Sequence, residues 1–400
     1  MQNTRKITDD LYYVGASDRK LALFENIYPI PRGVSYNSYL LLDEKTVLLD
    51  TTDAAVSEQF HENVAGALGG RNLDYLVINH MEPDHCALIQ DIAMRHPEVM
   101  VVTTAKAAAM IRQFFTFDID NRLMTVGEGD TLCTGRHTLS FVLAPMVHWP
   151  EVMFTYDTLD KTLFSADAFG TFGALNGNIY ADEVNFDRDW LDDARRYFLN
   201  IVGKYGIQVQ NALKKAATID INMICPLHGP IWRKDIAYFV EKHDIWSSYT
   251  PEEQGVLIVY GSIYGHTAAA AEKIASLLAE RGVKGIAVYD ASHTHVSQLI
   301  SEAFRYSHIV LAAATYNCDI FTPVENLLTD LKAHNWQNRT VSLIENGSWG
   351  PMAGKQMKSL LEQMKNITIV GDTITIKSAL KDEQLPELER LADTIAANLQ

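Results

Sequence analysis

The chain has 400 residues, of which 47% are hydrophobic and 21% charged, as is typical of a folded globular protein with room for two domains. Its net charge of −16 argues against nucleic acid as a main partner, and no apolar run approaches the roughly 18 residues of a membrane span, so we expect no membrane association. The start, MQNTRKITDD, has no apolar signal core, and the four cysteines form no CxxC pair, so we expect a cytoplasmic protein with neither a zinc ribbon nor its own iron–sulfur module.

The first half of the chain begins with strand signals. Apolar runs at residues 39–42 and 46–49 flank a polar turn, which predicts two neighbouring strands. A helix is predicted over residues 54–68, where two glycines follow, and a buried strand over residues 75–78. Strand and helix signals then alternate to about residue 230, which favours a layered α/β domain.

The second half alternates more regularly. Strands are predicted over residues 256–260, 286–289, 308–312, 340–344 and 367–370. Helices are predicted over residues 267–280, 296–305, 324–333 and 385–399. This order indicates a doubly wound parallel sheet of five strands, which binds ligands at the carboxyl ends of its strands. A polar stretch with Pro and Gly at residues 249–255 precedes it, so we expect domains at residues 1–250 and 251–400.

Metal-ligand residue types follow the apolar segments of the first half. They are His80, Glu82, Asp84 and His85, all from one turn after the strand at 75–78, and then His148, Asp167 and His228, each at the end of a later apolar segment. Any one of the last three, taken alone, is more often a structural residue. The joint pattern of imidazoles and carboxylates at strand ends predicts a shared metal site, with these side chains as its ligands and catalytic groups.

A phosphate-binding turn is predicted at residues 261–267, GSIYGHT, between the first strand of the second half and an alanine-rich helix. Backbone N–H groups and the dipole at a helix N-terminus hold phosphate, and Ser262 and Thr267 add hydroxyl donors. The turn is neither a GxxxxGK[ST] loop nor a GxGxxG motif, so a nucleotide hydrolase or dinucleotide site is not expected. Helix capping alone also explains such residues in about half of all cases.

Two further loops, at residues 314–319 and 345–350, follow the third and fourth strands and strengthen this interpretation. Tyr316 and Trp349 can stack on a flat ring, and small residues let backbone N–H groups approach its polar edge. The three loops together resemble the FMN site of flavodoxins, although His266 stands where many flavodoxins have Asn. The predicted FMN contacts are Ser262, Ile263, Tyr264, Gly265, His266, Thr267, Ala314, Thr315, Tyr316, Asn317, Asn346, Gly347, Ser348, Trp349 and Gly350.

The ligand pattern of the first half resembles the metallo-β-lactamase fold, an αββα sandwich, and within it the flavodiiron proteins. The common hydrolase version of this fold has His where this chain has Glu82. Histidine-rich sets suit zinc, whereas added carboxylates favour iron. A metallo-β-lactamase-like domain followed by a flavodoxin-like domain is the order of the flavodiiron family, and this resemblance covers essentially the whole chain.

The resemblance implies the role of each ligand. One iron would take His80, Glu82 and His148, and the other Asp84 and His228, with Asp167 as the bridge. His85 would be a further ligand of the second iron or a supporting residue, because members of the family differ at this point. His148-Trp149-Pro150-Glu151 also matches the family, and ordinary packing explains Trp149 without a chemical role.

The implied function is that of an oxidoreductase in which FMN relays electrons to a diiron centre that reduces O2 to water, NO to N2O, or both. The absence of CxxC pairs implies the minimal class without rubredoxin, which needs an external donor such as rubredoxin, F420H2 or another reductase. The family implies a head-to-tail homodimer or a dimer of dimers. The sequence does not choose between the two substrates.

Two alternatives remain open at this stage. A zinc-dependent hydrolase with an accessory flavodoxin domain would cleave an ester or thioester with a metal-bound hydroxide. A plain electron carrier would leave the first domain structural, but this would give no role to its ligand-type residues. Metal analysis distinguishes all three, because they require two irons, zinc or no metal.

Overall fold

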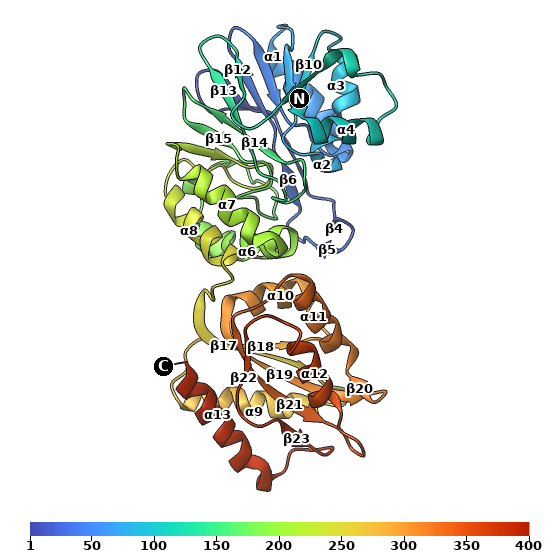
Figure 1. Cartoon of the computed structure of the whole chain (residues 1–400), viewed down its shortest axis with the longest axis vertical. Coiled ribbons are helices and arrows are strands. Elements are labelled where there is room, and N and C mark those ends of the chain that lie inside the picture. The colour runs from blue at the N-terminus through green and yellow to red at the C-terminus, as the bar shows by residue number, and fades with distance from the viewer. Residues whose placement is uncertain (400) are drawn as a thin grey trace. The chain divides into compact units, whose positions relative to one another are not determined.

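The computed structural model describes residues 1–399, and its chain separates into two units (Figure 1). Unit 1 runs from Met1 to Asp244, and unit 2 begins at Ile245. The stretch between the helix α8 (Ile236–Ser247) and the strand β17 (Glu253–Gly261) contains the domain boundary proposed from the sequence. Within residues 1–399, no helix combines the length and the apolar character required to cross a membrane.

Unit 1 contains two main sheets. The first has the order β1-β2-β7-β8-β9-β10-β11, formed by Arg5–Lys6, Leu11–Tyr13, Tyr39–Leu42, Thr46–Leu49, Tyr75–Val77, Met100–Thr104 and Leu123–Val126. The second has the order β12-β13-β14-β15-β16, formed by Thr131–Cys133, Thr138–Leu143, Met153–Asp157, Thr162–Phe164 and Met223–Cys225. Two small ribbons pair β3 (Ala16–Asp18) with β6 (Val34–Tyr36), and β4 (Leu23–Phe24) with β5 (Tyr28–Pro29).

The helices of unit 1 fall into two sets along the chain, one between strands of the first sheet and one after β15 of the second. One set is α1 (Ser57–Leu68), α2 (Pro83–Cys86), α3 (Ile89–Arg95) and α4 (Ala105–Phe114). The other is α5 (Phe186–Asp189), α6 (Leu191–Tyr197), α7 (Gly206–Ala216) and α8. Figure 1 shows α3 and α4 on one side of unit 1 and α7 and α8 on the other. The αββα sandwich expected from the sequence is therefore confirmed.

The helix α1 shows how the sequence forms this layer. Phe60, Val64 and Leu68 recur every four residues, lie on one face, and are buried in the core of the first sheet. Each such burial stabilises the fold by about 1.5–3 kcal/mol. The helix ends at Gly69, whose φ of 58° closes the last turn. The first three residues of the predicted helix form a 3-10 turn instead, because the Asp53 carboxylate accepts the amide of Ala55 at 2.7 Å.

A buried imidazole links the two sheets of unit 1. His137, in the turn between β12 and β13, contacts Asp10 beside β2 through Nε2 at 2.9 Å and Asp157 at the end of β14 through Nδ1 at 2.8 Å. A neutral imidazole can donate from only one nitrogen, so two carboxylate partners favour the doubly protonated ring. Arg136 also pairs with Asp10, Asp43 accepts the amide of His137 at 2.8 Å, and Asp160 lies in the same group.

Replacement of His137 by Gln is expected to destabilise unit 1 by about 3 kcal/mol at pH 6, because the buried carboxylate of Asp157 loses its cation and Asp10 keeps only Arg136. Burial lowers the pKa of His137, but the bonds to Asp10 and Asp157 outweigh it, so the pKa is raised above 6.5. This stabilisation is therefore full below pH 6.5 and is lost as the pH rises through the folded-state value. The free energy of unfolding, measured in urea, should be lower at pH 9 than at pH 6 in the wild type but not in the variant. An equal pH dependence in both would contradict this role.

Unit 2 is a doubly wound parallel sheet with the strand order β18-β17-β19-β21-β22. Besides β17, its strands are β18 (Ile286–Asp290), β19 (Tyr306–Tyr316), β21 (Arg339–Asn346) and β22 (Ile367–Ile369). The helices α9 (His266–Glu280) and α13 (Leu385–Asn398) pack together, as do α10 (Val296–Arg305), α11 (Thr322–Ala333) and α12 (Ala353–Leu361). Figure 1 shows the two helix sets on opposite faces of the sheet. This is the flavodoxin-like order, with the second strand outside the first, and it confirms the expected fold.

Two details differ from the predicted strands. The fifth strand is in two pieces, since β22 pairs with the start of β21 and β23 (Ile374–Ile376) with its end. Gly371, with a φ of 74°, lies between the pieces and turns the chain there. In addition, β20 (Asp319–Ile320) pairs antiparallel with the end of β19. Both additions lie at the carboxyl end of the sheet, beside the predicted ligand loops.

Candidate functional site

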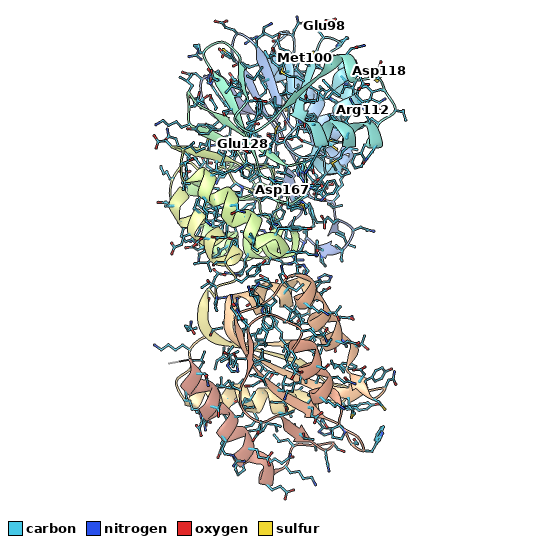
Figure 2. The ribbon with its side chains drawn as sticks, viewed as in Figure 1. Glu98, Met100, Arg112, Asp118, Glu128 and Asp167 are labelled. Carbon is cyan, nitrogen blue, oxygen red and sulfur yellow. The ribbon has the colours of Figure 1, made fainter. Side chains whose placement is uncertain are left out.

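The strand ends of both sheets of unit 1 bring the predicted metal ligands together. His80 and Glu82 follow β9 of the first sheet, whereas His148 follows β13 of the second. In the same way, Asp167 follows β15 and His228 follows β16. The site therefore lies where the two sheets meet. Figure 2 labels Asp167, which is 1% exposed, inside unit 1, in contrast to the exposed Glu98 and Asp118 at its edge.

The turn after β9 is fixed by a buried carboxylate. Asp50, after β8, accepts the amide of Asn79 at 2.7 Å and that of His80 at 3.3 Å. Pro83 then begins the short helix α2, because its fixed φ suits the first helical position. This helix carries Asp84 and His85 in its first turn. The turn at residues 80–85 thus supplies ligand atoms to two separate groups.

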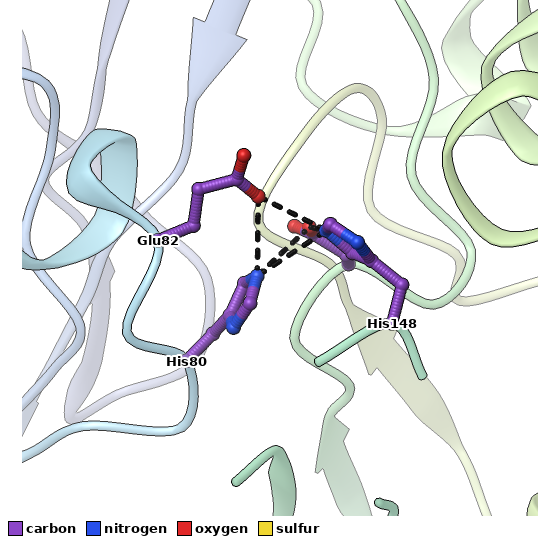
Figure 3. Close-up of side chains that lie close together, drawn as sticks. His80, Glu82 and His148 are labelled. Carbon is purple, nitrogen blue, oxygen red and sulfur yellow. Dashed lines mark hydrogen bonds and ion pairs between the residues drawn. The ribbon is translucent and has the colours of Figure 1, made fainter. Parts of the chain in front are cut away.

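The first group of ligand atoms consists of His80, Glu82 and His148 with one oxygen of Asp167. Nε2 of His80 lies 3.3 Å from Oε2 of Glu82 and 3.4 Å from Nε2 of His148. Nε2 of His148 lies 3.0 Å from both Oε2 of Glu82 and Oδ2 of Asp167. Figure 3 shows the three labelled side chains pointing toward a common centre.

The second group consists of Asp84, His85 and His228 with the other oxygen of Asp167. Nε2 of His85 lies 3.1 Å from Nε2 of His228 and 3.1 Å from Oδ1 of Asp167. Oδ2 of Asp84 lies 3.4 Å from Nε2 of His85 and 3.3 Å from that of His228. Each group therefore offers two imidazoles and one carboxylate, and Asp167 turns one oxygen toward each.

Two of these imidazoles are held in place by hydrogen bonds from their Nδ1 atoms to residues outside the two ligand groups. Nδ1 of His80 lies 2.9 Å from Oε1 of Glu151, and Nδ1 of His228 lies 2.7 Å from the carbonyl oxygen of Ser35. The Nδ1 of His228 must donate to that carbonyl, which leaves Nε2 free to face the centre. Glu151 belongs to the predicted His148–Glu151 motif, but the sequence assigned it no role.

Burial and mutual attraction shift the protonation of the cluster. Burial lowers the pKa of His148, but Asp167 and Glu82 outweigh it and raise that pKa to about 9. Burial raises the pKa of Glu82, yet bonds to His148 and His80 leave it well below the ordinary value. Because metal ligands bind deprotonated, metal uptake here must release protons.

Several residues that contact the ligands were not predicted, among them Glu25 and Tyr197. Glu25 lies on the β4–β5 hairpin and is exposed at its surface. Partial desolvation by the surrounding protein and the neighbouring charge of Glu82 raise its pKa to about 8. Tyr197 is fully buried, and its ring packs on His228 with centroids 5.5 Å apart. Both come from segments far from the ligand motif in sequence, without any signal of their own.

Unit 2 contains a cavity of about 330 Å³ at the carboxyl ends of β17, β19 and β21. Thirteen of the predicted FMN contacts line it: Ser262, Ile263, Tyr264, His266, Thr267, Ala314, Thr315, Asn317, Asn346, Gly347, Ser348, Trp349 and Gly350. The volume is within the range of small-molecule sites.

Four residues differ between the predicted contacts and the cavity lining. Gly265 does not line it, since its amide donates to Ser262 Oγ at 3.0 Å in the turn. Tyr316 does not line it either, and its ring packs edge-on against Phe321. Cys318 and Ser378 are added. Cys318 extends a predicted loop, whereas Ser378 follows β23, a strand that the sequence did not reveal.

Comparison with known proteins identifies the family to which this chain belongs. The sequence model of a protein family described as "ODP family beta lactamase" matches residues 34–229. A nitric oxide reductase of Moorella thermoacetica is 30% identical over 399 residues, 98% of each chain. The chain belongs to the flavodiiron protein family. The structure of the rubredoxin oxygen:oxidoreductase of Desulfovibrio gigas superposes with a TM-score of 0.92 at 27% identity, over 99% of this chain and 98% of that one.

A second relative is longer than this flavodiiron protein. The anaerobic nitric oxide reductase flavorubredoxin of Escherichia coli O1:K1 is 28% identical over 361 residues, which are 89% of this chain and 74% of the relative. These similarities confirm the expected oxidoreductase of the flavodiiron type. They give no support to the alternative of a zinc hydrolase with an accessory flavodoxin domain.

The donor set of this flavodiiron protein fits a pair of iron ions. Sets of two histidines and one carboxylate with open positions are typical of non-haem iron. Among the described residues, both oxygens of Asp84 and Oδ1 of Asp167 are buried without a hydrogen-bond partner. Buried carboxylate oxygens without partners are costly, and bound cations would satisfy them.

Proposed function

We propose that this protein reduces NO to N2O, O2 to water, or both, at a diiron centre in unit 1, with electrons relayed by FMN in unit 2. The observation that carries the proposal is the placement of Asp167, whose two carboxylate oxygens each face a separate group of two imidazoles and one carboxylate. The relatives are named as a nitric oxide reductase and as a rubredoxin oxygen:oxidoreductase, which supports the two substrates.

The residues of unit 1 position and isolate the centre. His80, Glu82 and His148 would hold one iron, and Asp84, His85 and His228 the other. Asp167, with one oxygen facing each group, would contribute a donor to both irons. The histidines His80, His85 and His228 are fully buried, so bulk water has little access from their side. When bound, the irons would supply open coordination positions and, with FMN, the electrons for reduction.

The residues of unit 2 are suited to FMN. The amides at the start of α9 and the hydroxyls of Ser262 and Thr267 would hold the phosphate. Trp349, which is 95% exposed, and Tyr264, which is 90% exposed, stand at the rim of the cavity, where a flat ring can stack on them.

The exposed aromatic rim also supports a partner surface. Large aromatic side chains rarely stand fully exposed on a monomer, and they are enriched in interfaces. We propose that a head-to-tail homodimer, or a dimer of dimers, covers the rim and brings FMN of one subunit to the irons of the other. An external donor, rubredoxin or another reductase such as one using F420H2, would supply the electrons. Mass measurement in solution tests the assembly, and a stable active monomer would refute it.

The direct test is the iron, zinc and FMN content of the purified protein, followed by anaerobic assays of NO and O2 consumption. About two irons and one FMN per chain, with consumption of either gas, would support the proposal. Zinc without FMN, or no consumption of either gas by protein loaded with both cofactors, would overturn it.

Simultaneous replacement of Ser262 and Thr267 by Ala is expected to weaken FMN binding by about 10-fold, because two hydroxyl donors to the phosphate are lost. Iron content should stay at the wild-type level, since the iron ligands are in unit 1. Fluorescence titration of the FMN-free protein measures the affinity. Unchanged FMN affinity would count against the phosphate-binding turn.

A further inference from the structure

The cavity of unit 2 is almost without charge. Its lining contains no lysine, arginine or carboxylate side chain, and its titratable side chains are those of Tyr264, His266 and Cys318. Of these, only histidine can become positive. Three charged residues adjoin the lining in sequence: Glu345 before Asn346, Asp319 after Cys318, and Lys377 before Ser378. Asp319 and Lys377 are exposed to solvent, and Glu345 is buried. Its two oxygens already accept the amide of Gly354 at 2.8 Å and the hydroxyl of Thr375 at 2.9 Å.

His266 stands at the place where a phosphate would bind. It is the first residue of α9, directly after Gly265, whose φ of 91° turns the chain into the helix. The helix has 15 residues and no acidic side chain in its first turn, so its free N–H groups and dipole favour an anion there. His266 is exposed, so its ring is free to turn toward that anion. The charged residues of α9 after His266 are Glu272, Lys273 and Glu280, and all lie more than a full turn further along the helix.

We propose that His266, the one lining residue able to become positive, supplies a side-chain charge for the phosphate of FMN, and that FMN affinity therefore depends on pH through this residue. The inference rests on the FMN site proposed above. A phosphate monoester carries about −1.5 to −2 charges near neutral pH, and the chain itself is acidic, with a net charge of −16. Histidine loses its charge between about pH 5 and pH 8, so its attraction for the phosphate is present at low pH and disappears at high pH.

The size of the effect follows from the exposure of the site. An exposed ion pair contributes up to about 1 kcal/mol, which corresponds to about a fivefold change in affinity. Riboflavin has the same ring without the phosphate, so its binding should not respond to His266. The residue thus sets the preference for the phosphorylated flavin as well as its pH dependence.

The test is a titration of FMN-free full-length protein with FMN and with riboflavin, at pH 6.0 and pH 8.5, followed by flavin fluorescence. The variants are His266→Asn, which removes the charge, and His266→Lys, which keeps it at both pH values. His293→Asn is the matched control, since His293 is exposed in the same unit, contacts Asp290 and does not line the cavity.

For His266→Asn, FMN affinity should fall about three- to fivefold at pH 6.0 and stay nearly unchanged at pH 8.5, with no change for riboflavin. His266→Lys should bind FMN at pH 8.5 at least as tightly as the wild type, and His293→Asn should match the wild type throughout. Equal FMN affinity of His266→Asn and the wild type at pH 6.0 would overturn the inference, as would an equal loss for FMN and riboflavin. If the wild type bound no FMN at all, the FMN site itself would be wrong.

Discussion

Replacement of Asp167 by Ala should abolish the pair of irons while FMN stays bound. Oδ2 of Asp167 lies 3.0 Å from Nε2 of His148 and Oδ1 lies 3.1 Å from that of His85, so one side chain serves both ligand groups. Its loss removes a donor from each proposed iron and the bridge between them. The four histidines of the two groups would then have one carboxylate fewer beside them to neutralise two divalent ions. We expect iron to fall below about one per chain and gas reduction to be lost.

The measurement is iron and FMN content of the variant, with NO and O2 consumption assayed anaerobically. Asp118→Ala is the matched control, because Asp118 is an exposed carboxylate of the same unit, away from the ligand groups. Retained FMN shows that unit 2 is folded, and a far-ultraviolet circular dichroism spectrum checks unit 1. Full retention of both irons by a folded Asp167→Ala protein would show that Asp167 is not the bridge.

The metal ligands could be predicted from the sequence because each lies a few residues after an apolar segment. His80 and Glu82 follow a buried strand within a few residues, and a strand end fixes where the next side chains lie. The same holds for Asp167 and His228, each a few residues beyond a strand of the second sheet. What the sequence could not supply is the distance between the two sheets, which decides that all these side chains reach one centre.

Contacts from distant segments could not be predicted in this way. Glu25 approaches Glu82 from a hairpin, and Tyr197 reaches His228 from a helix end, so neither has a local pattern that marks it. The carbonyl of Ser35 orients His228, and a backbone carbonyl is present at every position of a sequence. Such contacts depend on tertiary packing, which single-sequence patterns do not encode.

The flavodoxin-like unit was easier to predict because its strands are buried runs and its helices amphipathic. The predicted helix at residues 296–305 agrees with α10 at both ends. The divided fifth strand was missed because Ile374–Ile376 is only three residues long and follows Gly371 closely. As a consequence Ser378, which lines the cavity beyond that strand, was missed as well.

Replacement of Glu151 by Ala is expected to weaken iron binding by about 10- to 100-fold, although Glu151 is not among the proposed ligands. Its Oε1 lies 2.9 Å from Nδ1 of His80 and accepts the amide of Met81 at 2.9 Å. The contact with Nδ1 directs Nε2 of His80 at the first ligand group. Glu151 is 2% exposed, so water cannot easily replace its carboxylate. Burial raises the pKa of Glu151, but the bond to His80 outweighs it and keeps the group ionised at neutral pH.

A conservative variant separates orientation from charge. Gln at position 151 keeps an oxygen that can accept from Nδ1 of His80 but loses the negative charge, so Glu151→Gln should bind iron more tightly than Glu151→Ala and less tightly than the wild type. Competition with an iron chelator measures each affinity, and Glu98→Ala, at an exposed glutamate of unit 1, is the control. Wild-type affinity in Glu151→Ala would show that ligand atoms alone hold His80 in place. Equal losses in the Ala and Gln variants would show instead that the charge of Glu151, rather than its hydrogen bond, tunes the imidazole.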